Sequence, residues 1–365
     1  MCSDAVYLNA MVFVYHTYIN LAAGLELESL PPSSPANKYF PKTLRLLRER
    51  LADSSDNMKL SDSTVIVVLS LANHAHRLGQ YEAARSHLGG LRKLVDLRGG
   101  ISNFRRNPKL LLEMFRCDIG MALHNGLDTL FFNDPTREQY MPYLDKLSSF
   151  IPLECRPDVE TCTRSNTLGL TCPELAKAWD MMQTFCSLIN YAAESKRKIP
   201  QETMLNTMAA VMYRLLHMRF PSGSLDEVVR LGLSVFCSHI FLQWSNVGLP
   251  LHNLPLAYKT CLLDFGNSSK ISTKILFWLL MVGRMAVFGA DEDTWLKPWL
   301  WLSVNECGAG SWGEARTIVQ HFQWIDFVHD QYGRVIYDAV CALHFSDGNT
   351  PHIVGIHSVK TTSPA

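Results

Sequence analysis

The stretch SDSTVIVVLSLANHAHRLGQYEAARSHLGGLRKLVDLRGG, residues 61–100, predicts two helices joined by a tight turn. Ser61 or Asp62 supplies an oxygen that caps the first helix, and an almost continuous apolar run follows. Gly79 tolerates the left-handed conformation in which many helices end. The stretch therefore predicts a helical hairpin whose first helix is buried.

The second helix of this hairpin begins at about Tyr81 and ends at Gly99 and Gly100. Its apolar residues recur every three or four positions, and its charged residues fall on the opposite face, as in an amphipathic helix. We expect the apolar faces of the two helices to pack together across the turn. The residues predicted to form this contact are Val68, Leu69, Leu88, Leu91 and Val95.

Helical patterns also dominate on both sides of the hairpin, and no segment alternates polar and apolar residues with the period of a strand. Asn107 and Pro108 open a helix that ends at Gly126, and Ser224 and Glu227 form a capping box. The expected fold class is all-α, a multi-helix regulatory domain of packed helical hairpins. The other predicted helices span about 4–23, 39–51, 173–196, 201–220, 224–244, 254–265 and 271–288.

A proline-rich region separates two helical halves. Residues 133–171 contain four prolines and no long periodic run, so we expect a short helix near 140–147 and then a loop. The expected organisation is one domain, 1–345, and an irregular tail, 346–365. The domain has an N-terminal half, 1–132, the loop-rich connection, 133–171, and a C-terminal half, 172–345. Bare helical hairpins need a shared core, so we expect the halves to pack together.

Composition indicates a folded protein without a strongly charged surface. The 365 residues are 47% hydrophobic and 19% charged, and 34 basic residues balance 34 acidic ones. Zero net charge gives no overall attraction to nucleic acid or to an anionic membrane. The ten cysteines are typical of reduced thiols in an intracellular protein. The apolar N-terminal run contains Asn9, His16 and Asn20, which favours a buried helix over a membrane span.

Several short motifs are spread along the chain. In the hairpin they are GQYEAA at 79–84, HLGGL at 87–91 and LVDLRGG at 94–100. Beyond it they are NPKLL at 107–111, RCDI at 116–119, KILFWLL at 274–280, and FQW at 322–324 followed by Asp326. Together, and in this order, they resemble the regulatory (middle homology) domain of fungal zinc-cluster transcription factors.

The resemblance implies a nuclear protein that controls transcription, including genes of secondary metabolism, and that is not an enzyme. Its implied partners are other transcription factors or co-regulators, with a heterodimer with a zinc-cluster protein among them, and a small-molecule effector is compatible with it. Without the resemblance, the expected location is cytoplasmic. Two alternatives stay open: an all-α enzyme and a helical scaffold protein.

The chain departs from the family pattern because it lacks the six-cysteine DNA-binding module. That module needs C-x2-C pairs, and none occurs here; Cys155, Cys162 and Cys172 are too few to hold two zinc ions. We therefore expect no direct specific DNA binding, with dissociation constants no tighter than about 10⁻⁶ to 10⁻⁴ M at physiological salt.

The sequence yields no catalytic, metal-binding or cofactor-binding residues. His74 and His76 are two apart on a helix and so point in opposite directions, and 291–293 (DED) lacks the spacing that would align carboxylates on one helical face. No nucleophile elbow or phosphate-binding glycine motif appears. Six of the eight tryptophans lie beyond residue 277. We expect most of these tryptophans in the core, and any effector pocket among them.

Overall fold

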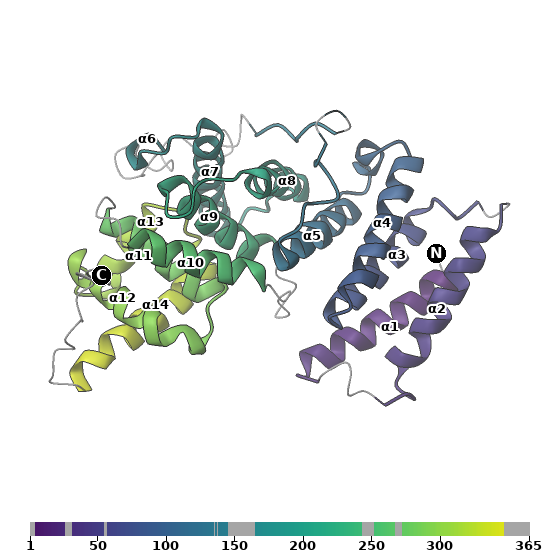
Figure 1. The fold of residues 1–365 in the computed structure, drawn as a ribbon, viewed down its shortest axis with the longest axis horizontal. Helices are drawn as coiled ribbons and strands as arrows, with labels where there is room; N and C mark the ends of the chain where they lie inside the picture. Colours follow the sequence, from purple (N-terminus) through teal and green to yellow (C-terminus); the bar gives the residue numbers. More distant parts are fainter. Residues whose placement is uncertain are drawn as a thin grey trace, which may run out of the picture.

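The computed structural model describes residues 4–25, 31–54, 57–134, 136, 138–144, 165–242, 252–266 and 272–346. Helices account for 75% of these residues, and none of them lies in a strand. The all-α prediction is therefore confirmed. Figure 1 shows an elongated arrangement with the N-terminal helices at one end and the C-terminal helices gathered at the other.

The N-terminal half consists of helical hairpins packed side by side. Helix α1 contacts α2 and α3, and α3 contacts α4 and α5. The bounds are α1 (Ala5–Ala22), α2 (Pro35–Ala52), α3 (Asp62–Arg77), α4 (Tyr81–Leu97), the 3₁₀ helix η2 (Ile101–Phe104) and α5 (Pro108–Asn125).

The predicted hairpin is α3 and α4. Ser61 caps α3 by accepting a hydrogen bond from the Thr64 N–H, and Gly79 has a φ of 69°. Every residue expected at the contact is buried, with Leu91 and Val95 fully so. These observations confirm the hairpin prediction. The sequence could predict it because the helix caps and the apolar periodicity are local signals that agree.

Helix α1 differs from the expected buried helix. Its inner face packs against the neighbouring helices through residues such as Ala10 and Phe13, which are fully buried. Its outer face exposes Leu8, Tyr15 and Ile19 to 46%, 60% and 44%. Both faces are apolar, so the sequence pattern did not reveal which one faces solvent. No helix in the described part of the chain is long and apolar enough to span a bilayer.

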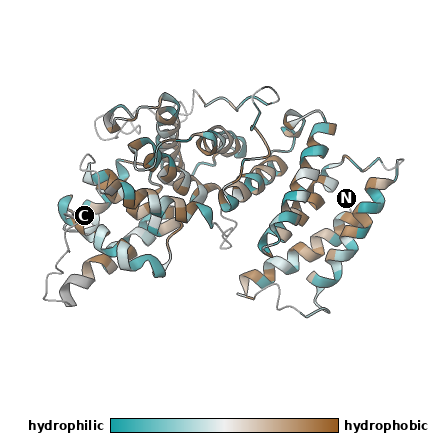
Figure 2. Ribbon diagram, in the orientation of Figure 1, coloured by the Kyte–Doolittle hydropathy of each residue, from teal (hydrophilic) through white to brown (hydrophobic). Residues whose placement is uncertain are grey.

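The C-terminal half is built around α9, which contacts α8, α10 and α11. Ser224 caps α9 as the capping box predicts, by accepting from the Glu227 N–H. Hydrophobic segments gather where these helices meet, as Figure 2 shows. The bounds are α6 (Ser165–Leu168), α7 (Pro173–Glu194), α8 (Gln201–His217), α9 (Leu225–Phe241), α10 (Asn253–Gly266), α11 (Thr273–Ala286), η5 (Ala290–Glu292), α12 (Asp293–Glu306), α13 (Trp312–Gln320) and α14 (Asp326–Ser346).

Helix α5 joins the two halves. It contacts α3 and η2 on one side and α8 and α10 on the other, and buried residues occur all around it. As predicted, Asn107 caps it, Pro108 begins it and Gly126 ends it with a φ of 66°. One hydrophobic cluster consequently extends through both halves.

The connection after α5 is not helical where the structure describes it. Residues 138–144 form no helix, so the start of the short helix expected near 140–147 is wrong. Pro142 and side-chain contacts to the backbone favour an extended path there. Residues 145–164, with the rest of the expected loop, and the tail beyond 346 lie outside the described residues.

Candidate functional site

An irregular segment follows α5 and runs from the N-terminal half to the C-terminal half. We call its described residues, 127–134, 136 and 138–144, the junction segment. With no helix of its own, it needs side chains from neighbouring elements to satisfy its buried backbone groups. The side chains that hold it are Arg92 on α4, Asp118 on α5 and Arg214 on α8.

Asp118 on α5 provides the first anchor. Its carboxylate accepts hydrogen bonds from the backbone N–H groups of Leu130 at 2.6 Å and Phe131 at 3.1 Å. It also accepts one from the Tyr213 hydroxyl on α8 at 3.0 Å. Burial raises the pKa of Asp118 to about 7, although these three donors favour its charged form. Asp118 thus fixes the start of the junction segment and ties α5 to α8.

Arg92 on α4 and Glu138 in the junction segment form the second anchor. An Arg92 nitrogen lies 2.5 Å from one Glu138 oxygen, and the other oxygen accepts the Phe132 N–H at 2.9 Å. Asp96 accepts two further hydrogen bonds from Arg92. Phe132 has a φ of 58°, unusual for a bulky residue, and the bond to Glu138 helps to hold it there.

Arg214 on α8 provides the third anchor. It donates a hydrogen bond to the Met141 carbonyl at 2.7 Å, and it forms an ion pair with Glu174 on α7 at 2.7 Å. Its guanidinium also lies over the rings of Tyr140 and Tyr143, 4.9 and 4.4 Å from their centroids. The junction segment is therefore held at one end by the N-terminal half and at the other by the C-terminal half.

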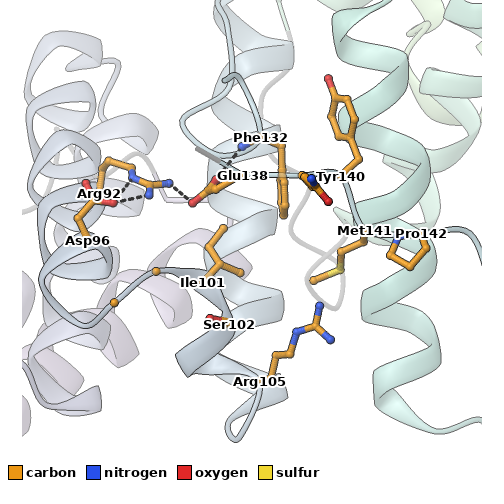
Figure 3. Close-up of a pocket in the computed structure, with 13 residues that line it drawn as sticks. Arg92, Asp96, Ile101, Ser102, Arg105, Phe132, Glu138, Tyr140, Met141 and Pro142 are labelled. Carbon is orange, nitrogen blue, oxygen red and sulfur yellow. Dashed lines mark hydrogen bonds and ion pairs between the residues drawn. The ribbon is translucent and has the colours of Figure 1, made fainter. Parts of the chain in front are cut away.

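A cavity of about 580 Å³ lies between the end of α4, η2 and the junction segment. We call it the junction pocket, and Figure 3 shows it. Its volume is in the range that small-molecule sites occupy. Its apolar lining comes from Ile101, Phe132, Met141 and Pro142, and its polar lining from Arg92, Asp96, Ser102, Arg105, Glu138, Gln139 and Tyr140, with Gly99 and Gly100 between.

The charges around the junction pocket are not all neutralised. Arg92 is engaged by two carboxylates, Asp96 and Glu138. Arg105 is exposed, lines the pocket from the η2 side and has no ion-pair partner within the described residues. Among the described residues of the lining, it is therefore the cationic group that remains open to a ligand.

A second cavity, of about 700 Å³, lies further toward the start of α4. Tyr81, Arg85 and Leu88 line it, whereas Arg92 and Asp96 line the junction pocket. These positions are three or four residues apart and so share one face of α4. The two cavities follow one another along this face.

The histidines and acidic residues considered in the sequence have structural roles. His74 packs between Phe13 and Phe40, whereas His76 packs against His124, so the two histidines do point in different directions. Among the described residues no group of three His, Cys, Asp or Glu side chains could hold a metal ion. Cys155 and Cys162 are outside that set.

Two residues of the acidic run at 291–293 form ion pairs with basic side chains of α10, α11 and α12. Glu292 pairs with Lys259, and Asp293 pairs with Arg284 and Lys297. The acidic residues therefore have a structural role: they lie at the start of α12, where negative charge is favourable, and they pair with basic side chains.

Only two of the six tryptophans expected mostly in the core are buried, and the other four are half-buried against it. Trp278 and Trp324 are buried, and their indole N–H groups bond to the Gln323 carbonyl at 2.9 Å and to Asp330 at 2.8 Å. The junction pocket lies elsewhere, in the connection between the halves, and none of the described residues that line it is a tryptophan.

The sequence singled out no residue of this site as functional, and Asp118, Glu138 and Arg105 are examples. The available signal was Asp118, an acidic residue inside the apolar run MFRCDIGMAL. Arg105 was visible only as part of a basic stretch, and Glu138 only as one acid in a weakly patterned region. Their roles depend on contacts between distant parts of the chain.

Three residues of the motif LVDLRGG line the junction pocket, namely Asp96 and the two glycines Gly99 and Gly100. Both glycines have positive φ, 85° and 92°, which lets α4 end and the chain turn into η2. In the comparisons with known proteins, no family model, curated protein or solved structure matches this chain.

Proposed function

We propose that this chain is a non-catalytic regulator of transcription that acts through protein partners and responds to a small molecule bound in the junction pocket. The observation that carries the proposal is the anchoring of the junction segment, which forms one wall of the pocket. Arg92 and Asp118 hold it to the N-terminal half, and Arg214 holds it to the C-terminal half. A ligand that shifts this wall would act on both halves at once.

The chemistry of the pocket favours binding over catalysis. Asp96 and Glu138, its two carboxylates, are occupied by Arg92, and Glu138 also accepts a backbone N–H. A general acid or base needs a proton that it can exchange with a substrate. Carboxylates held in this way serve structure better than proton transfer.

The transcriptional part of the proposal rests on the sequence resemblance. The motif LVDLRGG at 94–100 contributes Asp96, Gly99 and Gly100 to the pocket, so one of the motifs that carry the resemblance lies at the proposed site. The balanced charge of the chain supports action through a protein partner, because specific DNA binding needs a positive face.

The outer face of α1 is the surface that we assign to the partner. Leu8, Tyr15 and Ile19 lie seven and four residues apart, so they form one apolar stripe along the helix. Such a stripe fits the apolar face of an amphipathic helix on another protein.

The test is a reporter assay with the chain fused to an unrelated DNA-binding domain. We expect the fusion to change reporter transcription relative to the DNA-binding domain alone. Ile19→Asp should abolish that change because it places a charge in the apolar stripe, whereas Leu97→Asp, at a residue 70% exposed on α4, should not. A fusion that matches the DNA-binding domain alone would contradict the proposal and favour a scaffold unrelated to transcription.

A further inference from the structure

We infer that the junction pocket binds a small apolar monoanion, whose carboxylate pairs with Arg105 and whose apolar body lies against Phe132, Met141 and Ile101. The inference deepens the proposed function by naming the class of effector, and it uses the same pocket.

The open charge selects an anion. Arg92 is held between Asp96 and Glu138, so a ligand would have to displace a carboxylate to reach it. Arg105 has no such partner among the residues described, and Figure 3 shows its side chain near Met141. A guanidinium binds a carboxylate with two parallel hydrogen bonds, which gives both affinity and orientation.

The fixed carboxylates limit the charge of that anion. Asp96 and Glu138 line the same cavity as Arg105, and Arg92 offsets only one of their two negative charges, so a dianion such as a phosphate monoester would meet residual negative charge beside one open cation. Figure 3 shows Arg105 apart from Asp96 and Glu138, so a single carboxylate paired with Arg105 meets less of this repulsion. The pocket therefore favours a monoanion.

The apolar wall selects the rest of the ligand. Ile101, Phe132 and Met141 are buried residues that present apolar surface to the pocket. A cavity of about 580 Å³ accommodates a body of two fused rings or a comparable chain. Removing such a body from water supplies the non-directional part of the binding free energy.

The test compares an aromatic acid with its neutral amide on purified full-length chain. We expect 2-naphthoate to bind saturably with one site per chain in isothermal titration calorimetry at pH 7.5 and low salt. 2-Naphthamide has nearly the same shape and no charge, so it should bind roughly tenfold more weakly.

Arg105→Gln should weaken 2-naphthoate binding by roughly tenfold and leave 2-naphthamide binding unchanged. The matched control is Arg106→Gln, since Arg106 is the adjacent exposed arginine and does not line the pocket. It should bind both compounds as the wild type does. Urea unfolding of both variants checks that the fold is intact.

Three results would each overturn the inference: no saturable binding of 2-naphthoate, equal affinity for the acid and the amide, or wild-type affinity in Arg105→Gln. The proposed function fails separately, because its reporter assay contains no added ligand. Binding of 2-naphthoate by a chain that leaves the reporter unchanged would keep this inference and reject the transcriptional role.

Discussion

The Asp118 carboxylate on α5 accepts a hydrogen bond from the Tyr213 hydroxyl on α8 at 3.0 Å, and both side chains are buried. The two residues are 95 positions apart and belong to different halves of the chain. Asp118 also holds Leu130 and Phe131 of the junction segment. One buried carboxylate therefore links the two halves and one wall of the junction pocket.

Replacing Tyr213 by Phe should lower the free energy of unfolding by about 1.5–3 kcal/mol, the usual range for a hydrogen bond to a charged group. The measurement is urea unfolding at pH 8, above the Asp118 pKa of about 7, where the carboxylate is ionised. Tyr332→Phe is the control, since Tyr332 is 64% exposed, and it should leave stability unchanged. Equal stability of the two variants would show that the Asp118–Tyr213 bond does not join the halves.

Acid should destabilise the fold through His76. Its imidazole lies edge-to-face against His124, 4.6 Å between ring centroids, and burial lowers its pKa to about 4, with further lowering by His124, Arg77 and His252. In the unfolded chain the pKa is about 6.5, so the unfolded state binds more protons between pH 6.5 and 4. The contribution of His76 to stability is thus complete above pH 6.5 and is lost as the pH falls through 4.

His76→Phe should reduce this loss. Neither ring nitrogen of His76 has a hydrogen-bond partner in the described part of the chain, so Phe removes the titrating group without breaking a bond that the structure shows. Thermal unfolding from pH 7 to pH 4 should give a smaller drop in Tm for His76→Phe than for the wild type. The half-exposed His16, replaced by Phe, is the control and should keep the wild-type drop. A drop in His76→Phe as large as in the wild type would rule out this source of acid sensitivity.

Leu91→Ala should cost about 2–5 kcal/mol in unfolding free energy, because Leu91 is fully buried between α3 and α4 and its truncation leaves a cavity. Leu97→Ala on the same helix changes a side chain that is 70% exposed and should cost far less. Chemical denaturation of the two variants gives the comparison. A cost for Leu91→Ala no larger than for Leu97→Ala would mean that α3 and α4 do not pack as described.

The sequence predicted the helices well because their ends and periods are local signals. Ser61, Gly79, Asn107 and Gly126 all mark helix ends that the structure has. The outward face of α1 was not predictable, since apolar residues occur on both faces and only neighbouring helices decide which one is buried.

The junction pocket could not be predicted from the sequence, for a different reason. Arg92 and Glu138 are 46 residues apart and lie on opposite sides of α5 in the sequence, so their contact depends on the tertiary fold. No local pattern reports such a long-range pairing. The sequence predicted that Gly99 and Gly100 end α4. It did not predict that they line the pocket, because this depends on how the chain turns into η2.

The central claim is that the junction pocket controls the output of a transcription regulator, and a pocket-filling variant tests it most directly. Ser102 is exposed and lines the pocket, so Trp at this position can fill the cavity without displacing core residues. Arg106→Trp adds the same side chain on the surface next to it, outside the pocket lining. In the reporter assay with fusions present at equal levels, we predict that Ser102→Trp changes transcription relative to the wild type and that Arg106→Trp does not. Wild-type transcription from both variants would contradict the account.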